Sequence, residues 1–367
     1  MAKGDIIKND IVSFRDEEFG YLIIKPFEAD MTRTMYFTSN PFCNDNEHII
    51  ISTVRNDCEN FYLLNYKTGE AVQLTDHDRV DIVRSYFDKK RNYLYYSTGR
   101  ELRRVDIFTL KDESIYKSKT DMQSIGITCD GKFLVTSCAC DYEYKNNDGH
   151  SITTKMYRMF KVNLETGIES HILYRNFEID HIQCNPVIPD DIMFCSRGYF
   201  ACNHRIWRTN LDGTSGGAIG PEQPNEHRTH EYYTPSGKKI AYHGKFFTVN
   251  EELRFEKILD TFGTMNIDGS EDKYYKCPKG LSPIHSCMSP TEDLIICDQK
   301  NYLSIIKFND ETMELEYENI YRHDSTMSCN FVHPHPSISN DGRYVVFATD
   351  RGGKDKGNIY LLDLHSK

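Results

Sequence analysis

The sequence predicts an all-β protein, a seven-bladed β-propeller closed by its N-terminal segment and formed by residues 1–367 as a single domain. Three observations support this prediction. A polar turn followed by a strand-like run recurs seven times, and each copy is followed by a second strand that ends in Asp or Asn. From Asn65 to Asp363 this second motif completes six periods of about 50 residues, a spacing typical of propeller blades. Two stacked β-sandwiches, the alternative architecture, do not explain seven matched units.

Each copy of the first motif begins with polar turn residues and continues as a half-buried strand. Gly, Asn and Asp accept the backbone conformation of a tight turn, and the apolar residues that follow give the strand a buried face. The seven copies are CNDNEHIIIST (43–53), FDKKRNYLYYST (87–98), TCDGKFLVTSC (128–138), IPDDIMFCS (188–196), TPSGKKIAYHG (234–244), SPTEDLIICD (289–298) and SNDGRYVVFATD (339–350). Together with the strand that follows, each copy predicts a β-meander.

Closure of the ring is expected to involve the N-terminal segment. A single blade cannot bury both faces of its sheet, so blades pack radially and the first must meet the last. The chain stops soon after the strand IYLLDL (359–364), which leaves the last blade without an outer strand. We therefore expect the residues before about 45, which include GYLIIKPF (20–27), to supply the missing outer strand, or an inner one.

Composition limits the possible partners and the compartment. The 367 residues carry a formal net charge of −11, which argues against nucleic acid as the main partner because phosphate binding needs a basic surface. An anionic ligand would therefore need a local cluster of positive charge. The first 20 residues lack the apolar core of an export signal, and no segment approaches the roughly 20 apolar residues of a membrane span. We expect a soluble cytoplasmic protein whose 12 cysteines are reduced, and the sequence leaves its oligomeric state open.

Histidines gather at equivalent positions in four successive predicted blades. The loops that lead into the repeated strands meet at one end of a propeller's channel, and these loops contain His181, His227, His230, His285, His333 and His335. Two imidazoles two residues apart in an extended chain point to the same side, and a third from the next blade completes a common set of transition-metal ligands.

We therefore expect His285, His333 and His335 to bind a metal ion, with Asn330 as an oxygen donor. The alternative is that these histidines only bond to loop carbonyls at the mouth of the channel.

Four sequence blocks resemble the oligogalacturonate lyases, a family of cytoplasmic seven-bladed propeller enzymes of pectin breakdown. The blocks are HRIW (204–207), THEYYTPSGKKIAY (229–242), IHSCMS (284–289) and VHPHPSISNDGRYVVFATD (332–350). The resemblance implies a lyase that splits short, usually unsaturated, galacturonate oligomers by β-elimination into keto-deoxyuronate monomers, with a bound Mn²⁺ ion. Three imidazoles and an amide also suit zinc, nickel or iron.

The resemblance also implies roles for individual residues. By position, His285, His333 and His335 look like the metal ligands, Arg205 matches an arginine proposed as the catalytic base, and His230 matches a pocket histidine. The remaining substrate-binding candidates are His181, Asn185 and Arg228.

Two positions depart from the pattern expected of the family. Asn330 stands where a glutamine is expected, so its contact with the metal could be direct or through water. Asn185 stands where an arginine could bind a substrate carboxylate, so a related uronate-containing oligosaccharide is an alternative substrate.

The chemistry itself explains why a metal and a uronate belong together. Elimination removes the C5 proton, which is very weakly acidic because the enolate that forms carries two negative charges, and a divalent ion on the carboxylate offsets one of them. Arginine is a reluctant base because of its high pKa, although a nearby dication would favour its neutral form, whereas histidine titrates near neutrality. Arg205 and His230 are therefore both candidate bases. A non-catalytic propeller that binds a ligand is the alternative function.

Overall fold

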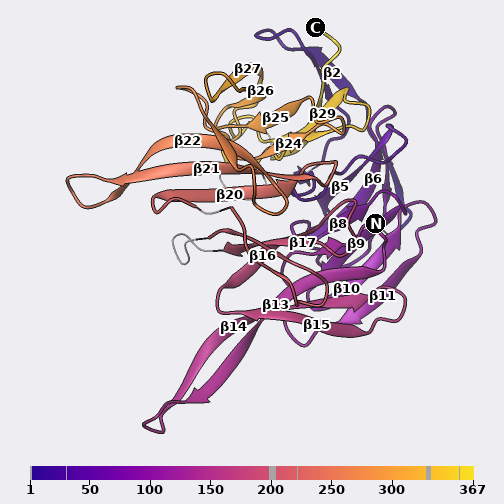
Figure 1. The fold of residues 1–367 in the computed structure, drawn as a ribbon. Coiled ribbons are helices and arrows are strands. Elements are labelled where there is room, and N and C mark those ends of the chain that lie inside the picture. Colours follow the sequence, from indigo (N-terminus) through magenta and orange to yellow (C-terminus); the bar gives the residue numbers. More distant parts are fainter. Residues whose placement is uncertain (1, 30, 198–203, 221, 328–331, 355) are drawn as a thin grey trace.

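A computed structural model describes residues 2–29, 31–197, 204–220, 222–327, 332–354 and 356–367. Within these residues all the regular secondary structure is β-strand, and the strands pair into consecutive antiparallel groups of four (Figure 1). We number these groups blades 1 to 7. The predicted all-β propeller class is confirmed by this arrangement and by the comparisons reported below.

The first four blades follow one another along the chain. Blade 1 contains β4 (Met31–Arg33), β5 (His48–Arg55), β6 (Cys58–Asn65) and β7 (Glu70–Gln73), with β1 (Ile6–Lys8) added beside β7. Blade 2 contains β8 (Tyr86–Asp88), β9 (Tyr93–Thr98), β10 (Glu101–Asp106) and β11 (Asp112–Lys117). Blade 3 contains β12 (Gly126–Ile127), β13 (Phe133–Lys145), β14 (Ser151–Asn163) and β15 (Glu169–Arg175). Blade 4 contains β16 (Glu178–Cys184), β17 (Ile192–Arg197), β18 (Ile206–Thr209) and β19 (Gly216–Ala218).

The last three blades carry most of the candidate site. Blade 5 contains β20 (Glu226–Tyr233), β21 (Lys239–Val249), β22 (Phe255–Asn266) and β23 (Lys273–Lys276). Blade 6 contains β24 (Ser286–Met288), β25 (Ile295–Asp298), β26 (Tyr302–Asn309) and β27 (Glu314–Arg322), and one parallel pair, Lys276 with Glu314, joins it to blade 5. Blade 7 contains β28 (Ser337–Ile338), β29 (Tyr344–Thr349), β30 (Asn358–Asp363) and β3 (Leu22–Lys25), with β2 (Val12–Arg15) beside β3.

The core lies between the blades. Seven clusters of buried apolar side chains each draw their members from two neighbouring blades. One of them joins the last blade to the first, with Val346 and Leu361 of blade 7 packed in the same cluster as Ile49 of blade 1. Burial of apolar area between sheets is the main favourable term of folding, so this chain of clusters holds the ring together.

The N-terminal segment closes the ring as an outer strand. β3 pairs antiparallel with β30, with Ile23 opposite Leu362, which confirms the prediction for GYLIIKPF. In Figure 1 the indigo N-terminal strands accordingly lie beside the yellow C-terminal ones. Two hairpins, β13–β14 and β21–β22, extend well beyond the other strands (Figure 1). Among the described residues no helix has the length and apolar character needed to span a bilayer.

Turn chemistry accounts for the repeated strand starts. Gly131 and Gly342, the glycines of two Asp-Gly turns, have φ values of 71° and 73°. This left-handed conformation favours glycine because a Cβ atom would crowd the backbone. The turns fix where β13 and β29 begin, and so they also fix the loops that lead to the channel.

Candidate metal centre and active site

Three histidines from neighbouring blades converge at the mouth of the channel. His285 lies directly before β24 of blade 6, and His333 and His335 lie in the segment before β28 of blade 7. One ligand nitrogen from each imidazole lies within 4.8 Å of the other two. The ring centroid of His285 is 4.2 Å from that of His335 and 5.5 Å from that of His333. We call these three residues the histidine cluster.

Asp298, at the end of β25, fixes the orientation of the cluster. Its carboxylate accepts hydrogen bonds from the His285 backbone N–H at 2.6 Å and from the His335 backbone N–H at 3.3 Å, and it lies 3.0 Å from His285 Nδ1. Burial alone would raise the pKa of Asp298, but the adjacent His285 outweighs burial and holds the pKa at about 2. A carboxylate on Nδ1 keeps the proton there and leaves Nε2 with its lone pair, as in many metal sites.

His335 presents a nitrogen that its protein neighbours do not satisfy. The side chain is buried, and its Nε2 atom has no hydrogen-bond partner. Its φ of 42° is uncommon for a residue other than glycine, Asn or Asp. Burial and the neighbouring His285 lower the pKa of both His333 and His335, so both imidazoles are neutral, as metal binding requires. The cluster therefore fits a transition-metal ion. Asn330, the expected oxygen donor, lies outside the described residues.

A second cluster lies across the channel on blades 4 and 5. Arg205 Nε donates a hydrogen bond to Glu231 Oε2 at 3.1 Å, and His181 Nδ1 lies 2.9 Å from Glu231 Oε1. Burial alone would raise the pKa of Glu231, but Arg205 and His181 lower it to about 2. Burial alone would lower the pKa of Arg205, but the Glu231 carboxylate beside it outweighs burial and raises this pKa above its usual value. We call Arg205, Glu231 and His181 the arginine–glutamate cluster.

The arginine–glutamate cluster is poorly suited to a metal although its spacing is suitable. His181, Cys195 and Glu231 also place ligand atoms within 4.8 Å of one another. The Arg205 guanidinium, however, already neutralises the carboxylate and lies 3.3 Å from His181 Nδ1. Burial raises the pKa of Cys195 well above its usual value, so its sulfur remains a protonated thiol and a poor ligand.

His230 lies between the two clusters. The centroid of its ring is 4.5 Å from that of His285 and 6.1 Å from that of His181. Its Nδ1 atom is buried without a hydrogen-bond partner, and its backbone has a φ of 51°. Burial, together with the nearby histidines, lowers the pKa of His230 well below its usual value. His230 is therefore a neutral imidazole with a free nitrogen next to the histidine cluster.

Sequence reasoning missed four contributors to this site: Tyr36, Phe37, Glu231 and Asp298. The Tyr36 hydroxyl lies 3.3 Å from His181 Nε2, and its ring centroid is 5.0 Å from that of His335. The ring centroid of Phe37 is 5.3 Å from that of His230. Both aromatics lie just upstream of the first turn-strand copy. Residues in that position are expected at the end of the channel, as the histidines were, so the same criterion would also have identified these two aromatics. Glu231 stands within the THE block, and Asp298 ends the sixth copy.

Two predicted substrate-binding residues are used by the fold instead. Asn185 is fully buried, and its side chain donates to Asp191 Oδ2 at 2.9 Å and to the Gly237 carbonyl at 2.8 Å while accepting from two backbone N–H groups. Arg228 is buried as well, donates to Glu226 Oε1 at 2.9 Å and Asp272 Oδ2 at 2.7 Å, and lies over the Tyr242 ring. Neither residue keeps a free group for a ligand, and a sequence cannot show such long-range pairing.

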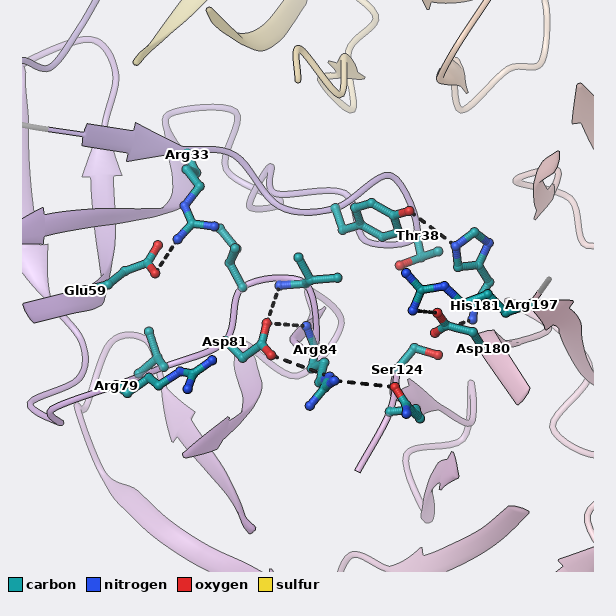
Figure 2. A pocket seen from close by; sticks show the side chains of 15 residues that line it. Arg33, Thr38, Glu59, Arg79, Asp81, Arg84, Ser124, Asp180, His181 and Arg197 are labelled. Carbon is teal, nitrogen blue, oxygen red and sulfur yellow. Dashed lines mark hydrogen bonds and ion pairs between the residues drawn. The ribbon is translucent and has the colours of Figure 1, made fainter. Parts of the chain in front are cut away.

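A cavity of about 470 Å³ continues the site across blades 1 to 4. His181 of the arginine–glutamate cluster lines it, and so does Tyr36, whose ring lies beside that of His335. Figure 2 shows the Arg33–Glu59 pair at one end of the cavity and the neighbouring Asp180, His181 and Arg197 at the other. The volume lies within the usual range for small-molecule sites.

The fold and the site together define a β-propeller with a cluster of three histidines that could hold a metal ion. The sequence model of the family described as oligogalacturonate lyase matches residues 1–262. The chain belongs to this family, which makes it a lyase, as the sequence blocks predicted.

Individual relatives agree with this assignment. The chain is 24% identical to an oligogalacturonate lyase of Dickeya dadantii and 23% identical to an oligogalacturonide lyase of Pectobacterium atrosepticum, over 96% of each chain in both comparisons. A solved structure described as oligogalacturonate lyase in complex with manganese superposes with a TM-score of 0.84 at 21% identity, covering 99% of this chain and 98% of the other. The oligogalacturonate lyase of Vibrio parahaemolyticus gives a TM-score of 0.83 at 20% identity, with 99% of both chains covered.

Proposed function

We propose that this chain uses a manganese ion to cleave short, preferably unsaturated galacturonate oligosaccharides by β-elimination, releasing keto-deoxyuronate monomers. The observation that carries the proposal is the position of His230, whose unpartnered ring nitrogen lies between the three imidazoles of the histidine cluster and the arginine–glutamate cluster. Membership of the oligogalacturonate lyase family supports the same reaction.

His285, His333 and His335 are the residues that would hold the ion, with Asn330 as the proposed fourth donor. Manganese is proposed because the similar solved structure was described in complex with it. A bound divalent ion supplies positive charge to the substrate carboxylate and so makes the adjacent C5 proton easier to remove. Asp298 keeps the His285 ring in place for this role through its bond to Nδ1.

We assign the proton acceptor to His230 and an electrostatic role to Arg205. His230 offers an unpartnered Nδ1 atom, and because burial and the nearby histidines lower its pKa, the imidazole is in the neutral form that can accept a proton. Arg205 is paired with Glu231, which keeps its guanidinium protonated and able to orient a substrate carboxylate. His181, bound to the same Glu231, holds the carboxylate that positions Arg205.

Chemical rescue separates these two roles. His230→Ala should lose most turnover, and added imidazole should restore part of it, because a free base can enter the space left by the ring. Arg205→Lys should keep measurable turnover because a lysine still supplies a positive charge. If Arg205→Lys is inactive while His230→Ala remains active, Arg205 is the base instead.

The proposed function itself is tested with the purified protein and added Mn²⁺. Saturated and unsaturated galacturonate dimers and trimers, together with other uronate disaccharides, are incubated with the protein, and keto-acid products are identified by mass spectrometry. His333→Ala is the matched control. Products from galacturonate oligomers support the proposal, whereas calorimetric binding without product would show a binding propeller, the second candidate function.

We further infer that residues 1–367 form one domain and that the protein acts in the cytoplasm. The unbroken series of inter-blade clusters supports the single domain. The ten described cysteines are free thiols, the form that a reducing compartment maintains. The net charge of −11 argues against nucleic acid as the main partner, and an acidic oligosaccharide would have to be bound by local cations.

A further inference from the structure

The cavity across blades 1 to 4 has more arginines than carboxylates in its wall. Four arginines line it, Arg33, Arg79, Arg84 and Arg197, against three carboxylates, Glu59, Asp81 and Asp180. We call it the arginine cavity. In a protein of net charge −11, such a local excess of cations is the feature that an anionic ligand needs.

Arg79 differs from the other three arginines of the cavity in its ion pairing. Arg33 bonds to Glu59, and Arg197 lies 3.2 Å from Asp180. Arg84 is held only loosely, at 3.5 Å from both Asp81 and Gln123. Within the described part of the chain, the exposed Arg79 side chain makes no hydrogen bond or ion pair, so its charge is available to a ligand.

The loop that carries these arginines is fixed by Asp81. The Asp81 carboxylate accepts hydrogen bonds from the Val83 backbone N–H at 3.0 Å and the Arg84 backbone N–H at 3.3 Å. Val80 and Ile82 are buried in the cluster between blades 1 and 2. Arg79 and Arg84 therefore project from an anchored turn, and Figure 2 shows both beside the cavity. An anchored turn reduces the entropy lost when a ligand binds.

One residue, Tyr36, links the arginine cavity to the histidine cluster. Tyr36 and His181 line the cavity, and the Tyr36 ring also contacts that of His335 at a centroid distance of 5.0 Å. An oligosaccharide with one uronate at the histidine cluster would thus extend its neighbouring sugar into the arginine cavity.

We propose that the arginine cavity binds the carboxylate of a second uronate residue of the same oligosaccharide, and that Arg79 is its main partner. This inference rests on the proposed function, because it assumes that the first uronate is bound at the histidine cluster. Arg79 thereby makes the enzyme selective for oligomers whose neighbouring sugar is also acidic.

The test compares two disaccharides in the manganese-loaded enzyme. One is digalacturonate, and the other has the same reactive uronate linked to a neutral sugar. Arg79→Gln should raise KM for digalacturonate about fivefold, as expected for one lost solvent-exposed charge pair, and leave kcat unchanged. KM for the disaccharide with the neutral sugar should not change. Arg84→Gln should raise KM for digalacturonate by a smaller factor.

Arg254→Gln is the matched control, because Arg254 is an exposed arginine paired with Glu252 in the turn between β21 and β22. It should leave both KM values unchanged. Equal KM values for wild type and Arg79→Gln with digalacturonate, or equal increases on both disaccharides, would overturn the inference. If the wild type turns over neither disaccharide, the proposed function itself fails and the inference fails with it.

Discussion

The histidine cluster and the arginine–glutamate cluster show that ligand spacing alone does not define a metal site. The histidine cluster places three candidate ligand atoms within 4.8 Å of one another, and His181 and Glu231 of the second cluster do the same together with Cys195. A buried carboxylate whose pKa is held at about 2 lies at each, Asp298 beside the first and Glu231 within the second. In the first, the carboxylate of Asp298 lies behind the His285 imidazole, and Nε2 of His335 has no hydrogen-bond partner. In the second, the carboxylate of Glu231 faces a guanidinium, which takes the place of an external cation.

This difference assigns separate tasks to the two sides of the channel. Neutral imidazoles with an unpartnered nitrogen can accept an external dication, whereas a buried arginine beside a carboxylate already has its charge balanced. The first cluster is suited to holding an ion, and the second to holding a guanidinium in a fixed position. The predictions below test this division.

The largest effect is expected from removing a ligand of the histidine cluster. His333→Ala should weaken Mn²⁺ binding by at least about 100-fold and abolish turnover, because two imidazoles remain where three are needed. Calorimetric titration of Mn²⁺ and elemental analysis measure the binding. Glu231→Gln is the control and should still bind the ion. Full metal occupancy in His333→Ala would show that the cluster is not the site.

The next effect concerns the opposite side of the channel. Arg205→Ala should lower kcat by about 100-fold or more, because the guanidinium that would contact the substrate is lost. Mn²⁺ affinity should be unchanged, because the three imidazoles of the histidine cluster remain. Steady-state kinetics and metal titration on the same preparation measure both quantities. Unchanged kcat would show that Arg205 takes no part in the reaction. A loss of Mn²⁺ affinity would show that the two clusters act as one metal site.

A smaller effect is expected behind the metal centre. Asp298→Asn should weaken Mn²⁺ binding by about 10- to 100-fold, because the amide no longer fixes the proton on His285 Nδ1 and orients the ring less firmly. Asp293→Asn, an exposed change in the turn before β25, serves as the control and should leave the affinity unchanged. Equal Mn²⁺ affinity in the wild type and Asp298→Asn would mean that the carboxylate plays no part in binding.

Glu231 is expected to have the smallest effect on the reaction, and its main effect should be on how the stability of the fold depends on pH. Its pKa is lowered from 4.5 to about 2 in the folded protein, so its contribution is complete above about pH 4.5 and is lost as the pH falls towards 2. The contribution amounts to about 3 kcal/mol of unfolding free energy.

Denaturant unfolding of the wild type and Glu231→Gln should therefore differ by this amount at pH 6 and converge at low pH. Glu47→Gln, which removes one partner of a half-exposed pair with Lys67, should cost less than about 0.5 kcal/mol at either pH. A constant difference between the wild type and Glu231→Gln across this range would show that the carboxylate does not titrate there.

Local chemistry explains why so much of the scaffold could be predicted. The Asp-Gly turns before β13 and β29 need only their own residues to form, and the apolar runs after them need only a sheet face to pack on. The outer-strand role of Leu22–Lys25 followed from counting strands in the last blade. The histidine cluster could be predicted because equivalent loops of neighbouring blades meet at the axis.

The remaining features of the site depend on contacts between distant residues. Asn185 and Arg228 looked available in the sequence, but Gly237 and Asp272 use their polar groups within the fold. The sequence alone does not show that Glu231, 26 residues away, accepts a hydrogen bond from Arg205. Neither the sequence periodicity nor a motif shows which buried charged residues will form a pair in the folded protein.

The sequence by itself determined the strands, their grouping into blades and the three imidazoles, because turn propensity, alternation and repeat spacing are properties of short segments. Only the tertiary structure decided which charges neutralise one another and which nitrogens stay free, because the pKa and the availability of a buried group depend on partners that closure of the ring brings together.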